Sequence, residues 1–287
     1  MNDNKISKNS IVAKFAVPIS FLILFFLAAN FTDCDLVTFW KRRNHLTDLV
    51  VDMIPPDFSY IQKILLPLFY TIQMSVTGTV LGTFFALVLS PFGAANLGFP
   101  AVIRRILRIV IQILRSFPAL ILALTATFLF GLGTFAGTFA ITLYTFAIMT
   151  KLTYEDANAA DVKAYQALRA MGVSKYVAYI HGILPEIIPG FLTNALYLLE
   201  TNVRHSSILG YVGAGGIGLL LNEKISWLEY DKVGTILLML FLTVCVIEYF
   251  SRYLAALIRK EHTIKKEQAR LLLLFLAALF LICTFTL

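Results

Sequence analysis

Four polar side chains fall on one face of an apolar segment near residue 200. Thr193, Tyr197, Glu200 and Arg204 stand at positions i, i+4, i+7 and i+11, the spacing of one face of an α-helix. In a membrane span, ionisable groups normally face other helices or a water-filled path. A guanidinium in such a path can bind a small oxyanion through paired hydrogen bonds. The stripe therefore predicts a polar translocation path, in which we include Asn202.

A structural interpretation of the same stripe stays open. Glu200 and Arg204 are four residues apart, so the two side chains can neutralise each other within one helix. Glu248 and Arg252 repeat this spacing in a later apolar segment, close to a basic cluster. There we expect a structural pair.

A glycine-rich segment, GYVGAGGIG, follows the stripe. It is not a phosphate-binding loop, because no Gly-Lys-Ser/Thr follows and no βαβ unit surrounds it. Non-helical backbone at membrane depth must be buried in protein or line a cavity. We therefore expect four glycines to fold a sharp turn at the outer mouth of the path (Gly213, Gly215, Gly216 and Gly218).

The composition calls for a lipid environment around most of the chain. Of the 287 residues, 59% are hydrophobic and 14% are charged, whereas soluble domains carry about 45–50% apolar and about 25% charged residues. The net charge of +7 fits Lys and Arg in cytoplasmic loops and does not indicate nucleic-acid binding. The cysteines are far apart, and His181 and His205 are isolated, so we predict no disulfide framework and no metal or cofactor in this chain.

Apolar segments predict six membrane helices, at about residues 11–29, 66–89, 119–130, 138–150, 188–202 and 233–256. A seventh run, 271–287, is either a further helix or the start of another unit. If the N-terminus is cytoplasmic, the basic clusters at the N-terminus, 104–115, 151–175 and 252–270 all lie inside, as the positive-inside rule requires. Residues 31–66 are expected to be a polar loop, not helical at the prolines of IPPDFSY.

Two segments have distinctive helix faces. Small or hydroxylated residues on one face of the second span predict close helix packing (Thr71, Ser75, Gly78 and Gly82). A polar stripe opposite Ile and Leu predicts an amphipathic helix at the cytoplasmic interface (Arg104, Arg108, Gln112 and Arg115).

The polar stretch 151–190 predicts a helix, a glycine turn and a second short helix. Gly172 ends the first helix, Ser174 is a candidate N-cap of the second, and Pro185 ends it. The first helix has a smooth apolar face that suits a groove on a partner protein (Ala157, Ala160, Ala164, Leu168 and Met171).

Within this stretch, QALRAMGVSKYVAYIHGILP resembles the cytoplasmic signature of ABC importer permeases, which runs EAA, three residues, Gly, nine residues, Ile-x-Leu-Pro. Gln replaces the usual Glu, and Gly182 replaces the usual Ile. The resemblance implies that residues 155–185 hold the coupling helix, which docks on a separate subunit that binds ATP and Mg. The positions that match the motif are those expected to couple to ATP hydrolysis (Gln166, Ala167, Leu168, Gly172, Leu184 and Pro185).

The segment YLLETNVRHSSILGYVGAGGIG closely resembles that of phosphonate ABC transporter permeases, the PhnE-like family, and the resemblance covers about residues 64–260. It implies an all-α polytopic membrane bundle with the type I (MetI-like) permease fold. Residues 1–63 would form an N-terminal helix and loop, and 261–287 a basic linker and apolar helix. It also implies a homodimer in the cytoplasmic (inner) membrane of a bacterium, importing a phosphonate-type anion with an ATP-binding subunit and an extracytoplasmic substrate-binding protein.

Other functions remain to be weighed. Permeases for methionine or another amino acid share glycine-rich turns and the helix–glycine–helix segment. An integral membrane enzyme would need clustered Asp, His or metal ligands at a membrane face, and the sequence has none. A purely structural scaffold would not need the polar stripe. Because the chain has no nucleotide-binding motif, we expect it not to be an enzyme and ATP hydrolysis to occur in a separate subunit.

Overall fold

The computed structural model describes residues 3–32 and 36–260, and every regular element within them is a helix. The chain divides into two units, Met1–Ile54 and Pro55–Leu287. The first unit contains α1 (Asp3–Phe31), which covers the first predicted span, and α2 (Leu36–Asp52). The expectation of a loop there is wrong for α2, because this polar stretch has no Pro or Gly to interrupt helical hydrogen bonds. The apolar run 271–287 lies outside the described residues.

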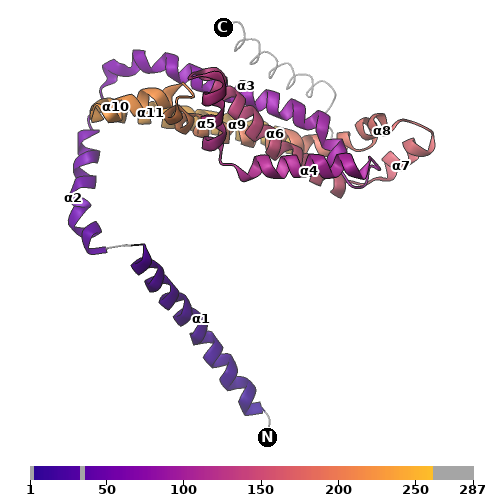
Figure 1. The fold of residues 1–287 in the computed structure, drawn as a ribbon, viewed down its shortest axis with the longest axis horizontal. Coiled ribbons are helices and arrows are strands. Elements are labelled where there is room, and N and C mark those ends of the chain that lie inside the picture. The colour runs from indigo at the N-terminus through magenta and orange to yellow at the C-terminus, as the bar shows by residue number, and fades with distance from the viewer. Residues whose placement is uncertain (1–2, 33–35, 261–287) are drawn as a thin grey trace. The chain divides into compact units, whose positions relative to one another are not determined.

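The second unit is a helical bundle whose two ends are distinct. In Figure 1, α3 runs along the length of this unit, with α7 and α8 at one end and α10 at the other. Its elements are a 3-10 turn (Phe58–Tyr60), α3 (Ile61–Gly93), α4 (Ala101–Ser116), α5 (Ala119–Phe130), α6 (Thr134–Ala159), α7 (Lys163–Ala170), α8 (Lys175–Gly182), α9 (Leu184–Leu209), a second 3-10 turn (Gly210–Val212), α10 (Ile217–Ser226) and α11 (Tyr230–Lys260).

Several of these helices suit a bilayer. Among the described residues, three segments are long and apolar enough to cross one: Phe58–Gly93, Thr134–Ala159 and Tyr230–Ile258. Two bent pairs raise the number to five if each is one span: α4 with α5, bent by 96°, and α8 with α9, bent by 70°. Pro18–Phe31 in α1 is a shorter apolar helix. The chain is therefore a polytopic membrane protein.

Helix boundaries differ from expectation where polar residues continue a helix. The third predicted span, 119–130, coincides with α5, but α6 extends past the predicted 138–150 at both ends. The glycine-rich loop contains the unpredicted helix α10. Pro185 does not end α8; it lies in the first turn of α9, where the missing N–H costs no hydrogen bond.

The predicted helix running from Ala157 to Met171 is interrupted. α6 ends at Ala159 and α7 begins at Lys163. The Asp161 carboxylate accepts a hydrogen bond of 3.0 Å from the Lys163 backbone N–H, which stabilises the turn just before α7. Ala157 is buried in α6, whereas Met171 is 70% exposed. The predicted single apolar face is therefore wrong.

The contact between α3 and α6 depends on small residues. A Cβ atom at Gly78 would lie 2.6 Å from Ile141 Cγ2, and one at Gly82 would lie 2.7 Å from Thr145 Cβ. No real Cβ fits at these distances, so the two backbones approach as closely as glycine permits.

Replacing Gly82 by Val should separate these two helices. The Thr142 carbonyl oxygen would be 2.8 Å from the added Cβ, and backbone cannot give way as a side chain can. We expect the free energy of unfolding to fall by about 1–3 kcal/mol, which would appear as a lower Tm of the purified protein in detergent. Gly190→Ala is the matched control, since its Cβ would meet only Asp156 Oδ2, at 3.9 Å.

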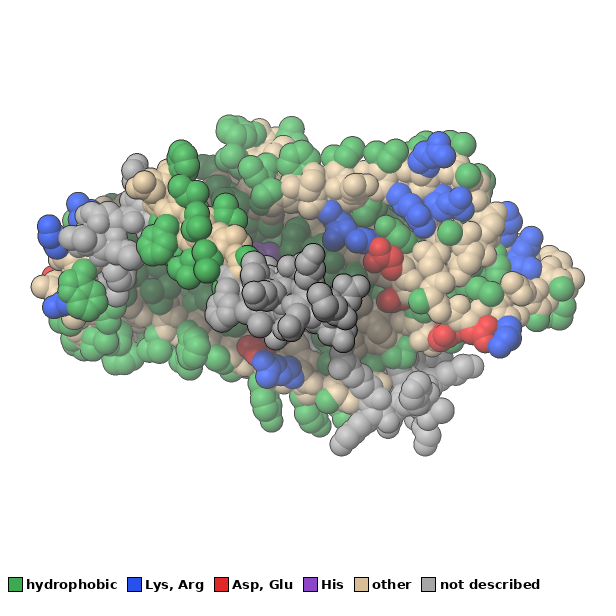
Figure 2. All heavy atoms as spheres, turned by 90° about the horizontal axis from the view of Figure 1, so that it is seen from below, with side chains coloured by type: hydrophobic (Ala, Val, Ile, Leu, Met, Phe, Trp, Pro, Cys, Tyr) green, Lys and Arg blue, Asp and Glu red, His purple; other side chains and the backbone are tan. Residues whose placement is uncertain are grey.

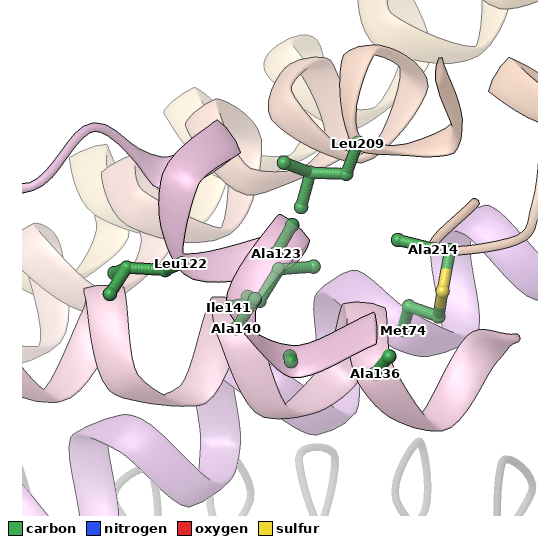
Figure 3. Close-up of a cluster of buried hydrophobic side chains, with 9 residues drawn as sticks. Met74, Leu122, Ala123, Ala136, Ala140, Ile141, Leu209 and Ala214 are labelled. Carbon is green, nitrogen blue, oxygen red and sulfur yellow. The ribbon is translucent and has the colours of Figure 1, made fainter. Parts of the chain in front are cut away.

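A buried apolar cluster joins α5, α6 and α9 to α3. Figure 3 shows Met74 of α3 pointing toward Ala214 in the glycine-rich segment, with Ile141 of α6 and Leu209 of α9 in the same cluster. This cluster fixes the end of α9 and the glycines against the bundle, and so positions the residues considered next.

Candidate functional site

A cavity of about 620 Å³ lies between α9 and α11. It brings together three residues of the predicted stripe with a polar pair from α11. Its lining consists of Thr193, Leu196, Tyr197, Glu200, Ser251, Arg252, Ala255 and Ala256. The α11 side of this cavity was missed from the sequence, since the periodicity of one helix does not reveal which other helix packs beside it.

Each acidic group near the cavity is paired with an arginine on its own helix. The Arg204 guanidinium donates to the Glu200 carboxylate, and Arg252 donates to Glu248. The Arg204 side chain is half exposed, whereas that of Glu200 is 12% exposed. Glu200 is thus neutralised while part of Arg204 stays available to a ligand.

Asn202 lies away from this cavity. It is fully buried, and its amide nitrogen donates to Thr79 Oγ1 of α3 and Thr145 Oγ1 of α6, each at 2.8 Å. One turn further, Ser206 and Ser75 share a hydrogen bond of 2.6 Å. These contacts fix the rotation of α9, which turns Glu200 and Arg204 to the opposite side.

Asn202→Ala should destabilise the bundle. It removes two hydrogen bonds between helices, worth together about 1–3 kcal/mol in a membrane interior. We expect a lower Tm in detergent than for Thr201→Ala, whose hydroxyl bonds only to the Tyr197 carbonyl of its own helix. Equal Tm values for the two variants would contradict this role for Asn202.

Residues 210–218, which we call the glycine loop, pack tightly on α3 and on the turn before α6. Gly213, Gly215 and Gly216 have φ values of +81°, +80° and +72°, the left-handed region that glycine enters without strain. The Gly133 N–H donates to the Gly213 carbonyl at 2.9 Å, and the Ile217 N–H donates to Thr71 Oγ1 at 2.8 Å.

Gly218 differs from the other three predicted glycines. It lies inside α10 rather than in the turn. A Cβ at this position would lie 2.0 Å from the Ser207 carbonyl oxygen. Gly218 therefore permits α10 to pack on the end of α9.

Charged residues hold the other end of α10. Lys224, only 6% exposed, lies 3.0 Å from carboxylate oxygens of both Glu223 and Glu229. The hydrogen bond to Glu229, and to a lesser extent the one to Glu223, raises the pKa of the Lys224 ammonium, although burial lowers it. Lys232 also binds Glu229, at 2.6 Å. This network joins α10 to the start of α11.

We call residues 163–182 the elbow, comprising α7, the turn at Gly172 and α8. Gly172 has φ +84°, and nothing lies within 4 Å of where its Cβ would be. Gln166, Ala167 and Gly172 are exposed, whereas Leu168 is partly buried. Ser174 precedes α8 without a side-chain capping bond.

The elbow also gives a reason for Gly182, which departs from the family motif. A Cβ at this position would lie 2.8 Å from the Tyr165 backbone nitrogen. α8 therefore packs directly on the backbone of α7, and Ile would not fit. Leu184 and Pro185 begin α9 behind this contact.

The two isolated histidines noted in the sequence lie on different helices, His181 in α8 and His205 in α9. In the parts of the chain that the structure describes, no group of three His, Cys, Asp or Glu side chains could hold a metal ion. His205 stacks edge-on against Tyr144, with ring centroids 5.3 Å apart. His181 is an exposed residue of α8.

The chain is similar to known transport permeases. It is 31% identical over 217 residues to the phosphite transport system permease protein PtxC of Stutzerimonas stutzeri, covering 76% of this chain and 79% of that protein. It is 31% identical over 203 residues to the phosphate-import permease protein PhnE of Mycolicibacterium smegmatis, covering 70% of this chain and 38% of that protein.

The solved structure of the MetNI methionine ABC transporter in an inward-facing conformation has a similar fold. A chain of it superposes with a TM-score of 0.61 at 20% identity, covering 70% of this chain and 99% of that one. The all-α, MetI-like permease fold expected from the sequence is therefore confirmed. Residues 78–260 match the family described as "Binding-protein-dependent transport system inner membrane component". The chain belongs to this family and is a membrane-spanning permease component of an ABC importer.

Proposed function

We propose that this permease imports phosphite, a phosphonate or phosphate across the cytoplasmic membrane of a bacterium. The observation that carries the proposal is the 31% identity to a phosphite permease over 76% of the chain. The half-exposed Arg204 side chain supports it: Arg204 does not line the cavity itself but is paired with Glu200, which does, and a guanidinium binds the oxygens of a phosphorus oxyanion in two parallel hydrogen bonds. The fold similarity to a methionine transporter carries no substrate information.

The path is proposed to form between two copies of this chain. In this single chain, Tyr197 is 63% exposed and the Arg252 side chain 76% exposed, although both lie in apolar spans. Polar and charged groups in a span usually face protein or water rather than lipid. A second copy placed over the α9–α11 cavity would remove these groups from lipid and enclose a polar path. The glycine loop would then lie near its mouth.

The orientation of the permease across the membrane is inferred from the positions of its basic residues. On the face drawn in Figure 2, the larger group of Lys and Arg side chains lies toward the α7–α8 end. Under the positive-inside rule, this is the cytoplasmic end, with the N-terminus also inside. The elbow, with exposed Gln166, Ala167 and Gly172, would dock there on a separate ATP-binding subunit. The substrate-binding protein would dock at the α10 end.

Uptake by the reconstituted complex tests the proposal. The chain is placed in liposomes with its ATP-binding subunit and binding protein, and uptake of labelled phosphite and labelled 2-aminoethylphosphonate is measured with ATP inside. Phosphate and methionine serve as competitors. We expect ATP-dependent uptake that phosphorus oxyanions inhibit and methionine does not. Inhibition by methionine alone would overturn the substrate assignment and favour an amino-acid permease.

A further inference from the structure

Residues 94–98, which we call the linker, begin the connection from α3 to α4 and are held by the end of α6 and by the elbow. Each of the last four residues of the linker makes a hydrogen bond to α6, α7 or α8. Ala95 N–H donates to Asn158 Oδ1 at 2.7 Å, and Asn96 Nδ2 donates to the Ala157 carbonyl at 2.8 Å. Tyr165 Oη donates to the Leu97 carbonyl at 2.6 Å, and Lys175 Nζ donates to the Gly98 carbonyl.

Apolar burial strengthens this attachment. Leu97 is 1% exposed and Ala94 is fully buried, in a cluster that contains Tyr165 of α7 and Ala178 and Tyr179 of α8. Two linker residues, Ala94 and Leu97, are therefore anchored in the hydrophobic cluster of the elbow, while Ala95, Asn96 and Gly98 are exposed. A closely packed core transmits displacement because it has little free volume to absorb it.

The helices on both sides of the linker are fixed to the same region. A Cβ at Gly93, the last residue of α3, would lie 2.7 Å from the Tyr154 ring. From α4, Arg108 Nε donates to the Gly93 carbonyl at 3.0 Å, and its guanidinium lies 5.1 Å from the centre of the Tyr154 ring. Tyr154 of α6 thus joins the end of α3 to the middle of α4, next to the linker's own contacts with the elbow.

α3 connects this attachment to the opposite end of the bundle. From Gly93 to Thr71 the helix extends about 33 Å, at about 1.5 Å per residue. At Thr71 its hydroxyl oxygen accepts the Ile217 N–H, the first of α10, at 2.8 Å. A Cβ at Gly216 would lie 2.5 Å from the same oxygen. α3 is thus in direct contact with the glycine loop at Thr71, ten residues after the helix begins at Ile61.

We propose that residues 94–98 are the transmission element of the permease: they pass movement of the elbow to α3, and α3 passes it to the glycine loop. The inference rests on the proposed docking of the ATP-binding subunit at the elbow. It assigns Tyr165, Asn158 and Lys175 as positioning residues that act through the linker. Because α3 is held at Gly93 and at Thr71, it connects the elbow to the glycine loop without contacting a ligand itself.

The test compares coupling, not activity alone. Tyr165→Phe removes the hydroxyl that binds Leu97, and Asn158→Ala removes a bond at the exposed surface, where folding is little affected. Tyr176→Phe is the matched control, since its hydroxyl reaches only the Val88 carbonyl at 3.5 Å. Each variant is reconstituted with its partner subunits, and uptake of labelled phosphite per ATP hydrolysed is measured together with complex assembly and Tm.

We expect Tyr165→Phe and Asn158→Ala to lower uptake per ATP hydrolysed about fivefold or more, with assembly intact and the control within twofold of wild type. Gly172→Pro in the same assay reports on the elbow itself. If Gly172→Pro uncouples the complex while Tyr165→Phe and Asn158→Ala do not, the linker is not the transmission element and the elbow assignment stands. If none of these variants uncouples it, the proposed docking at the elbow is wrong.

Discussion

Arg204→Ala is expected to raise the substrate concentration for half-maximal uptake by about 10- to 100-fold. A hydrogen bond between a charged group and an anion is worth about 1.5–3 kcal/mol, and about 1.4 kcal/mol corresponds to a factor of ten. Arg204→Lys keeps the positive charge but loses the two-pronged geometry, so we expect an intermediate effect. The measurement is initial uptake of labelled phosphite against concentration in proteoliposomes.

A double variant separates this role from that of a structural ion pair. Arg204→Ala alone leaves the largely buried Glu200 carboxylate without its partner, which costs stability and repels an anion. Glu200→Gln with Arg204→Ala removes that unpaired charge and should restore the Tm. If Arg204 binds the substrate, uptake stays impaired in the double variant. Recovery of uptake together with Tm would make the pair structural only.

The sequence predicts the helices that are long and apolar and misses what depends on contacts between them. α5 matches its predicted bounds, because Pro118 precedes its first residue and Gly131 follows its last, and both act through local backbone chemistry. α2 and α10 were missed because the expectation rested on apolar runs, and both segments are largely polar or glycine-flanked. α2 contains no Pro or Gly, whereas α10 contains Gly218 and depends on its packing against the end of α9.

The residues of the candidate path were likewise predicted only where one helix is enough to place them. Heptad-like spacing correctly groups Thr193, Tyr197 and Glu200 on one side of α9, where they line one cavity. Asn202 is two residues from Glu200, so its side chain points to a different face of the helix and into the contact with α3 and α6. Arg252 joins the cavity from another helix, and no pattern in one sequence pairs α9 with α11.

Gly172→Pro is expected to abolish coupled transport. Gly172 has φ +84°, whereas the proline ring fixes φ near −65°. The turn between α7 and α8 cannot form with proline, so the exposed surface of α7 would no longer have the orientation in which we propose that it docks on the ATP-binding subunit. We expect ATP hydrolysis that loaded binding protein no longer stimulates, and uptake reduced about tenfold or more. The membrane helices should remain folded, with the far-ultraviolet circular dichroism of the wild type.

Gly172→Asn and Gly172→Val show which property of glycine matters. No atom lies within 4 Å of a Cβ at this position, so neither side chain meets a steric obstacle. Asn tolerates the left-handed region, whereas β-branched Val is strained there. Coupling should therefore be kept in Gly172→Asn and impaired in Gly172→Val. Equal coupling in Gly172→Val and wild type would mean that the backbone turn is not what docking requires. Substrate-stimulated ATP hydrolysis at the normal rate in Gly172→Pro would remove the elbow from the coupling interface.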